Sequence, residues 1–405
     1  MIVFKIVLIA AIVVWIIAIY LAYGDGAIGR RAMNYEHIRA NNETDMPPLS
    51  VIIVTHDQAS ALRRHLPEIL NQDYERFEVI VVDMHSTDET KDILERLEMQ
   101  YANLRHTYVP ASARDISLQR LALTLGIRSA TNEWVVITRP DCRPASPSWL
   151  QRIGETIAKP RISLQSRRLK TPDMVLGIGR YGDSCNSVFE HKTGFHRLWN
   201  TIANIDHILN CHAAMRADAC NIAYRKSFFL KHGGFGAQDL KGGAEELLVN
   251  YNSTATNTAI LLSPSALVIQ DPIGNAEQWL QERIFYAETR RHQHHSALYR
   301  FKQFMRMLFP WLVLFFILIR LIISIIMLFI EPTSETAIIT IVMCLLVVSY
   351  YTIQIMEFRK TALALDCHNY SLSIPYLELC IPLWNIKALI GHRLAARNEF
   401  RKKFV

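Results

Sequence analysis

The chain of 405 residues is long enough for a catalytic domain together with membrane elements, and half of its residues are hydrophobic. Its net charge of +7 comes from 44 basic and 37 acidic residues, and the basic residues gather beside apolar runs, which indicates a membrane surface rather than nucleic acid as the partner. The seven cysteines are odd in number and contain no Cys-x-x-Cys pair, which excludes a regular disulfide framework.

Three apolar runs are long enough to cross a bilayer as helices, and they cover residues 2–23, 308–330 and 337–356. The first run is too long for a cleavable signal, and Arg30 and Arg31 follow it, so we expect an uncleaved anchor. The predicted organisation is therefore an anchor, a globular domain and two further transmembrane helices.

Basic residues beside the apolar runs predict the orientation of the chain in the membrane. The segment before the second run, "RRHQHHSALYRFKQFMR", is strongly basic, the loop "EPTSET" has no Lys or Arg, and the chain ends in "RNEFRKKFV". This pattern places the globular domain and the C-terminus in the cytosol, at the cytoplasmic (inner) membrane. Residues 276–307 are expected to include a basic helix that lies in the membrane interface. Residues 357–405 are expected to form a cytosolic or interfacial basic tail, and within it residues 374–390 are expected to be interfacial or re-entrant.

Strand and helix signals alternate through the globular region, residues 48–275. A β-branched strand, "LSVIIVTHD", precedes a helix with leucines at helical spacing, and "FEVIVVDMHSTDETKDILERLE" reads as a strand, a polar turn and an amphipathic helix. Ser86 with Glu89 predicts a capping box at the start of that helix. A further helix leads into the strand of "EWVVITRPDCRP". The alternation predicts an α/β fold with a mostly parallel sheet.

Three acidic residues follow predicted strands, namely Asp57, Asp83 and Asp141. Ligands of open α/β sheets bind outside the carboxyl ends of the strands, so we expect these acids to converge on one crevice. The alternative is that each Asp is only a turn or cap residue.

The order of motifs resembles the family-2 glycosyltransferases of the GT-A fold. The resemblance covers about residues 49–250 and rests on "SVIIVTHDQ", "VIVVDMHSTDET", "GIRSA", "TRPDC", "NIAYRKSFFLKHGGF" and "KGGAEELLVN". It implies a Rossmann-like GT-A domain in a membrane-anchored, inverting enzyme of the bacterial type.

The resemblance also assigns roles in donor binding. Asp57 and Asp83 match positions that bind the base and ribose of the nucleotide, and Arg120 matches a frequently basic position that reaches base or phosphate. An exposed helix residue is the alternative for Arg120. Asp141 matches the second acid of an Asp-x-Asp motif and is expected to hold Mg²⁺ or Mn²⁺ on the donor diphosphate. Arg139 replaces the first acid and is expected to neutralise part of the diphosphate charge; the alternative is that it points away and has no role.

Glu246 is the first candidate for the general base and Glu245 is the second, because the resemblance places an acidic motif opposite the donor. The alternative is that this pair merely starts an amphipathic helix. Arg283 lies where processive members carry Gln-x-x-Arg-Trp, but Leu280 and Ile284 replace Gln and Trp. This departure argues against a polymer-extruding synthase and leaves Arg283 as a diphosphate contact.

We therefore expect an inverting glycosyltransferase that moves a sugar from a nucleotide-sugar to a membrane-associated, lipid-linked saccharide during polysaccharide biosynthesis for the cell envelope. One alternative is a non-catalytic nucleotide-sugar-binding or scaffold relative. It is supported by Arg139, Met84 and Ala244, which stand at positions where members of the resembled family frequently carry an acidic residue. A second alternative is a polyprenyl-phosphate sugar synthase, which shares the donor chemistry and differs in its product.

Overall fold

The structure is a computed structural model. It describes residues 12–13, 15–17, 46–110, 117–159, 161–162, 169–182, 187–211, 214–235, 243–254, 256–294, 296–330 and 334–403. The chain divides into two compact units, which we call the globular unit (residues 32–294 and 391–405) and the helical unit (residues 1–31 and 295–390). Most of the predicted anchor, residues 2–23, lies outside the described residues.

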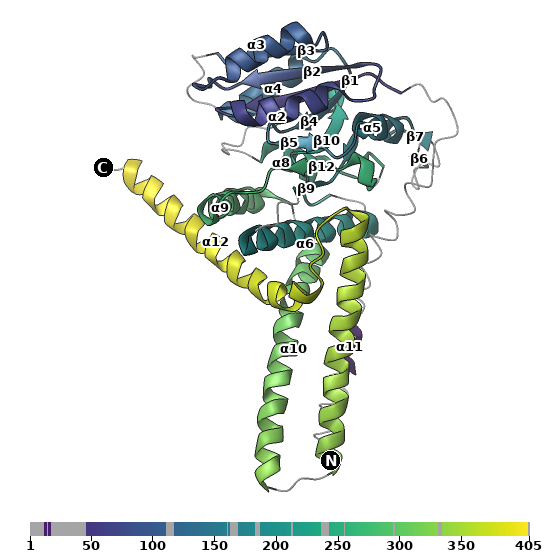
Figure 1. Cartoon of the computed structure of the whole chain (residues 1–405), viewed down its shortest axis with the longest axis vertical. Coiled ribbons are helices and arrows are strands. Elements are labelled where there is room, and N and C mark those ends of the chain that lie inside the picture. The colour runs from purple at the N-terminus through teal and green to yellow at the C-terminus, as the bar shows by residue number, and fades with distance from the viewer. Residues whose placement is uncertain are drawn as a thin grey trace. The chain divides into compact units, whose positions relative to one another are not determined.

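A seven-stranded sheet forms the centre of the globular unit, in the order β11-β8-β10-β4-β1-β2-β3 (Figure 1). Its strands are β1 (Leu49–Thr55), β2 (Phe77–Asp83), β3 (Leu104–Tyr108), β4 (Trp134–Thr138), β8 (Met174–Leu176), β10 (Ile222–Arg225) and β11 (Thr258–Ile260). Strand β10 runs antiparallel to its neighbours β4 and β8, and the other pairs in this sheet are parallel. The predicted α/β fold with a mostly parallel sheet is confirmed.

Helices cover both faces of this sheet. The helices of the globular unit are α2 (Ala59–Leu70), α3 (Thr90–Gln100), α4 (Leu118–Ser129), α5 (Trp149–Ala158), α6 (Val188–Cys211), α7 (Lys226–Lys231), α8 (Ala244–Asn252) and α9 (Ala276–His292). Successive residues of β1 point to opposite faces, so Val51 joins Leu66 of α2 in one core, and Ile52 joins Ile127 of α4 in the other. Burial on both faces explains the unbroken apolar run of β1, and each such side chain stabilises the fold by about 1.5–3 kcal/mol.

A second, three-stranded sheet lies beside the first and has the order β5-β12-β9. Its strands are β5 (Cys142–Pro144), β9 (Gly179–Tyr181) and β12 (Val268–Gln270), and a separate hairpin pairs β6 (Arg161–Ile162) with β7 (Leu169–Lys170). The buried amide of Asn221 connects the two sheets. It donates to the carbonyl oxygens of Ile178 and Ala266, at 3.1 and 2.9 Å, and accepts from the indole N–H of Trp149 at 3.1 Å.

The predicted capping box at Ser86 and Glu89 is wrong. Helix α3 begins at Thr90 with Glu89 as its N-cap residue, which makes no side-chain cap hydrogen bond. The hydroxyl of Ser86 instead donates to Oδ1 of Asp83 at 2.5 Å and accepts from the backbone N–H of Asp57 at 2.9 Å. Ser86 therefore forms hydrogen bonds with the residues at or just after the ends of β2 and β1 and does not cap the start of α3.

The helical unit contains α10 (Ala297–Ile330), α11 (Ser334–Ala364), a short 3₁₀ turn (Ser371–Ser373) and the first part of α12 (Ile374–Lys403). Among the described residues, one helical segment, Thr340–Ala364, is long and apolar enough to cross a membrane, with a mean hydropathy of 1.8. It overlaps the predicted span 337–356. The span predicted at 308–330 is helical within α10, and residues 374–390 are helical within α12, but their relation to a membrane stays a prediction.

Candidate active site

The carboxyl ends of β1, β2 and β4 lie at one edge of the main sheet. Thr55 of β1 pairs in register with Asp83 of β2, and Ile53 of β1 pairs with Thr138 of β4. Asp83 is the last residue of β2, whereas Asp57 and Asp141 follow the ends of β1 and β4 by two and three residues. The structure therefore brings these three predicted acids to the same edge.

Asp57 and Asp83 are oriented by the turn between β2 and α3. Oδ1 of Asp57 accepts from the backbone N–H of Thr87 at 2.6 Å, and Asp83 accepts from both the N–H and the hydroxyl of Ser86. The backbone N–H of Thr87 holds the pKa of Asp57 below its usual value, so this exposed carboxyl is ionised at neutral pH. Asp57 has a φ of 50°, in the left-handed region that Asp tolerates better than most side chains.

Asp141 lies at the corner between β4 and β5 and is half-buried. Its Oδ1 is 3.2 Å from Nε of Arg139, and its Oδ2 accepts from the side-chain amide of Gln270 at 2.8 Å. The backbone N–H of Asp271 donates to the carbonyl oxygen of Asp141 at 2.8 Å. Strand β12, which carries Gln270, therefore fixes this corner.

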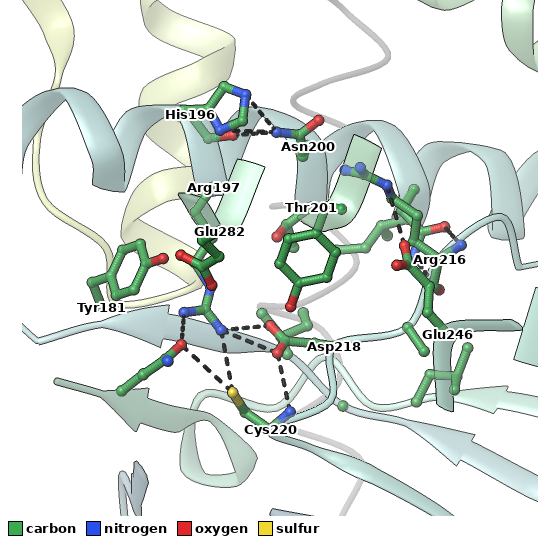
Figure 2. A pocket seen from close by; sticks show the side chains of 18 of the residues that line it. Tyr181, His196, Arg197, Asn200, Thr201, Arg216, Asp218, Cys220, Glu246 and Glu282 are labelled. Carbon is green, nitrogen blue, oxygen red and sulfur yellow. Dashed lines mark hydrogen bonds and ion pairs between the residues drawn. The ribbon is translucent and has the colours of Figure 1, made fainter. Parts of the chain in front are cut away.

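A cavity of about 160 Å³ opens in the globular unit and is lined largely by α6, α9 and the segment before β10 (Figure 2). Eight charged side chains line it: Arg139, Arg197, Arg216, Asp218, Glu246, Glu282, Arg283 and Arg290. Figure 2 shows Arg197 between Tyr181 and Asp218, with Arg216 beside Glu246. Of the predicted site residues, Arg139, Glu246 and Arg283 line this cavity, and the three acids Asp57, Asp83 and Asp141 are not among its lining residues.

Glu246 and Glu245 belong to the first turn of α8, and both are buried. Glu246 lines the cavity, where its Oε1 is 3.4 Å from Nε of Arg216, whereas Glu245 is not among the lining residues. Burial raises the pKa of Glu246, and the charges of Arg216 and Arg290 act in the opposite direction. Burial also raises the pKa of Glu245.

Close packing of α8 against α9 sets the position of this first turn. Gly243 precedes α8 with a φ of 74°, and a Cβ atom built on it would lie 2.4 Å from Oγ1 of Thr289 in α9. Only glycine adopts this backbone conformation without strain and leaves room for Thr289.

Arg283 is buried on α9 and contacts two ring systems. Its Nη1 lies 2.5 Å from Nε2 of His196 in α6, and its guanidinium carbon lies 4.9 Å from the ring centroid of Trp279. Burial, with a smaller effect from Arg216, lowers the pKa of Arg283 to about 10. Burial also lowers the pKa of His196, which makes its neutral ring nitrogen the acceptor for Arg283.

Comparison with known proteins identifies the domain that carries the strand-edge acids Asp57, Asp83 and Asp141. Residues 50–224 match the model of the family described as glycosyl transferase family 2. The chain contains a family-2 glycosyltransferase domain. The domain has the GT-A fold, as the resemblance implied, and residues beyond 224 contribute α8 and α9 to its cavity.

Individual relatives cover different shares of the chain. Over 53 residues, the chain is 40% identical to the GalNAc(5)-diNAcBac-PP-undecaprenol beta-1,3-glucosyltransferase of Campylobacter jejuni, a match that covers 13% of this chain and 17% of that relative. The structure of mannosyltransferase PcManGT from Pyrobaculum calidifontis, in complex with GDP-Man and Mn²⁺, aligns over 96% of this chain and 98% of that chain, at 17% identity and a TM-score of 0.53. The S. aureus TarS 1–349 structure in complex with UDP-GlcNAc covers 83% of this chain and 92% of that chain, at 14% identity and a TM-score of 0.40.

Arg120 lies apart from the other predicted residues of the glycosyltransferase domain. It lines a second hollow together with Phe229 and Phe235, and its Nη2 donates to the carbonyl oxygen of Phe235 at 3.4 Å. Its contact with the donor stays a prediction.

Sequence reasoning missed much of the cavity wall. The missed residues are His196, Arg197, Arg216, Asp218, Gln270, Glu282 and Arg290. One signal was available, because α6 carries "FHRLWN", in which charged and polar residues interrupt a hydrophobic helix. The salt bridge of 2.8 Å between Arg197 and Asp218 uses residues from separate segments, and their pairing depends on the tertiary structure.

Proposed function

We propose that this chain transfers a sugar, with inversion, from a nucleotide-sugar donor to a lipid-linked saccharide acceptor at the membrane. The observation that carries the proposal is that Glu246 and Arg139 line one cavity, although they come from a helix and a strand end more than a hundred residues apart. An acid that accepts a proton and a cation that neutralises a diphosphate are the two groups that this reaction needs.

In the proposed reaction, Glu246 takes the proton of the acceptor hydroxyl as its oxygen attacks the anomeric carbon. The bond between that carbon and the diphosphate oxygen breaks, and the nucleoside diphosphate leaves with the bonding electron pair. Burial raises the pKa of Glu246 and makes its carboxylate a stronger base, while Arg216 keeps it ionised. Asp57 and Asp83 hold the base and ribose, and Arg139 faces the developing charge on the diphosphate.

Asp141 is the residue proposed to hold Mg²⁺ or Mn²⁺. Its carboxylate pairs with the guanidinium of Arg139, and this ion pair supports the proposal that a positive group can lie at this corner. Among the described residues, no cluster of three His, Cys, Asp or Glu side chains forms a cation site from protein alone, which suits a cation that is shared with substrate oxygens. When bound, the cation would neutralise charge on the departing diphosphate.

Membrane association of the acceptor is supported by two findings. Segment Thr340–Ala364 has the length and composition of a membrane span, and the partial relative from Campylobacter jejuni is named for an undecaprenol-linked substrate. We propose that the domain faces the cytosol at the cytoplasmic membrane and contributes to cell-envelope polysaccharide.

A direct test uses the purified full chain in nanodiscs, labelled nucleotide-sugars and a lipid extract. We expect transfer of label to lipid from at least one donor, and its loss in Glu246→Gln and Asp141→Asn. The exposed Glu277 of α9 provides the control variant Glu277→Gln, which should keep the wild-type rate. Retention of the wild-type rate by both site variants would refute the assignment, and transfer of sugar to a lipid phosphate would favour the polyprenyl-phosphate synthase.

A further inference from the structure

Three arginines line the same cavity as His196: Arg216 from the segment before β10, and Arg283 and Arg290 from α9. We call this set the arginine cluster. His196 and Arg283 are more than nine-tenths buried and contact each other directly. The charges that lower the pKa of His196, after burial itself, are those of Arg283, Arg290 and Arg216.

The arginine cluster places three positive charges on the wall of one cavity, and the carboxylate of Glu246, which interacts with Arg216 and Arg290, offsets part of that charge. Arg216 also lowers the pKa of Arg283, as expected of two like charges held close together. Buried like charges are costly unless an anion offsets them, and three guanidinium groups facing one cavity offer many N–H donors to the same ligand. The ring of Trp279 supports the guanidinium of Arg283 and limits its movement, which favours recognition of a planar or tetrahedral oxyanion.

The position of the cluster relates it to the proposed base. Arg216 belongs to the cluster and is 3.4 Å from Glu246. An anion bound by Arg216 therefore lies close to the hydroxyl from which Glu246 takes the proton. Arg139 and Asp141, by contrast, mark the strand edge at which we place the donor diphosphate.

We infer that the arginine cluster binds a phosphate or diphosphate group of the acceptor, close to the hydroxyl that receives the sugar. Such an acceptor is a short saccharide on a lipid phosphate or diphosphate, rather than the far end of a long chain. This inference rests on the proposed function and adds the class of acceptor. The same chemistry would suit the donor diphosphate, so the two sources have to be separated by experiment.

The experiment compares binding of two phosphate sources to the full chain in detergent. The acceptor-side probes are farnesyl phosphate and farnesyl diphosphate, with farnesol as the uncharged control, and the donor-side probes are UDP and GDP with Mn²⁺. The variants are Arg283→Gln and Arg290→Gln. The matched control is Arg291→Gln, because Arg291 is exposed on the same helix and contacts His392.

We expect a farnesyl phosphate probe to bind the wild type and farnesol to bind far more weakly. Each cluster variant should weaken binding of the phosphate probe by at least about tenfold, the loss expected for a charge-assisted hydrogen bond, while binding of the nucleoside diphosphate stays unchanged. Arg291→Gln should change neither the binding of the phosphate probe nor the binding of the nucleoside diphosphate. Arg283→Lys should restore part of the binding, because it keeps the charge but loses the forked geometry.

Three results would overturn the inference. The first is that neither farnesyl phosphate probe binds the wild type, and the second is that the cluster variants weaken UDP or GDP while the farnesyl probes are unaffected. The third is that transfer requires Glu246 but the acceptor KM is unchanged in Arg283→Gln and Arg290→Gln. In the third case the proposed function stands and only the acceptor site is wrong.

Discussion

Arg216 reaches Glu246 from the segment before β10, and its Nε lies 3.4 Å from Oε1 of that carboxylate. The contact sets two effects against each other. Burial raises the pKa of Glu246 and strengthens it as a base, while the guanidinium lowers the same pKa and preserves the ionised form. The balance between them decides the pH at which the proposed base works.

Glu246→Gln is expected to lower kcat by at least about 100-fold, because general base catalysis typically contributes that much or more. Binding of the nucleoside diphosphate should persist, since Gln keeps the size and polarity of the side chain. Product formation at saturating substrates and calorimetry of nucleotide binding test the two parts. A larger loss in Glu245→Gln than in Glu246→Gln would move the role to Glu245.

The rate should fall as the pH falls through the raised pKa of Glu246, because protonation removes the base. This acid limb should lie above the ordinary Glu value of 4.5. Arg216→Gln removes a charge that lowers that pKa, so the limb of kcat should move to higher pH. A profile of kcat against pH for both proteins is the measurement. An acid limb at the same pH in both would show that Arg216 does not act on the base.

Asp141→Asn should abolish the part of nucleoside diphosphate binding that depends on Mn²⁺. A ligand that binds only the native state raises its melting temperature, so Mn²⁺ and nucleoside diphosphate together should stabilise the wild type more than either alone. We expect this added stabilisation to disappear in the variant. Asp73→Asn is the control, because Asp73 is exposed and precedes β2, at the opposite edge of the sheet. Equal stabilisation of Asp141→Asn and wild type would place the cation elsewhere.

Gly243→Ala should destabilise the globular unit more than Gly233→Ala. Both glycines have a φ of 74°, so both variants incur a backbone strain of about 1 kcal/mol. A Cβ at Gly243 would also collide with Thr289, whereas one at Gly233 meets nothing within 4 Å, and overpacking adds about 1–3 kcal/mol. Urea unfolding followed by tryptophan fluorescence compares the two. Equal losses of unfolding free energy in the two variants would mean that α9 shifts at Thr289 with no loss of stability.

The fold and the strand edge were predictable because both depend on short-range patterns. The apolar run of β1 and the Asp at the end of β2 specify a buried strand and a polar strand end within a few residues. The capping box failed because the hydroxyl of Ser86 bonds to Asp83 and to the backbone N–H of Asp57 instead, and Asp57 lies 29 residues earlier in the chain, beyond a local pattern.

The cavity wall was predictable only in part for the same physical reason. Glu246 belongs to a motif, but the residues that determine its pKa, Arg216 and Arg290, lie 30 and 44 residues away along the chain. Gln270 contacts Asp141 from a strand 129 residues later. Apart from the polar interruption "FHRLWN" in α6, the side chains that meet through the packing of α6, α8 and α9 are not marked by a local pattern in the sequence.

The buried amide of Asn221 holds the carbonyl oxygen of Ile178, a residue that lines the cavity, and joins it to the segment before β12 and to α5. A polar joint therefore fixes one residue of the cavity lining, while several of the charged side chains that line the cavity project from α6 and α9. If the proposed acceptor site is right, its residues on those two helices can be exchanged with the joint between the sheets preserved.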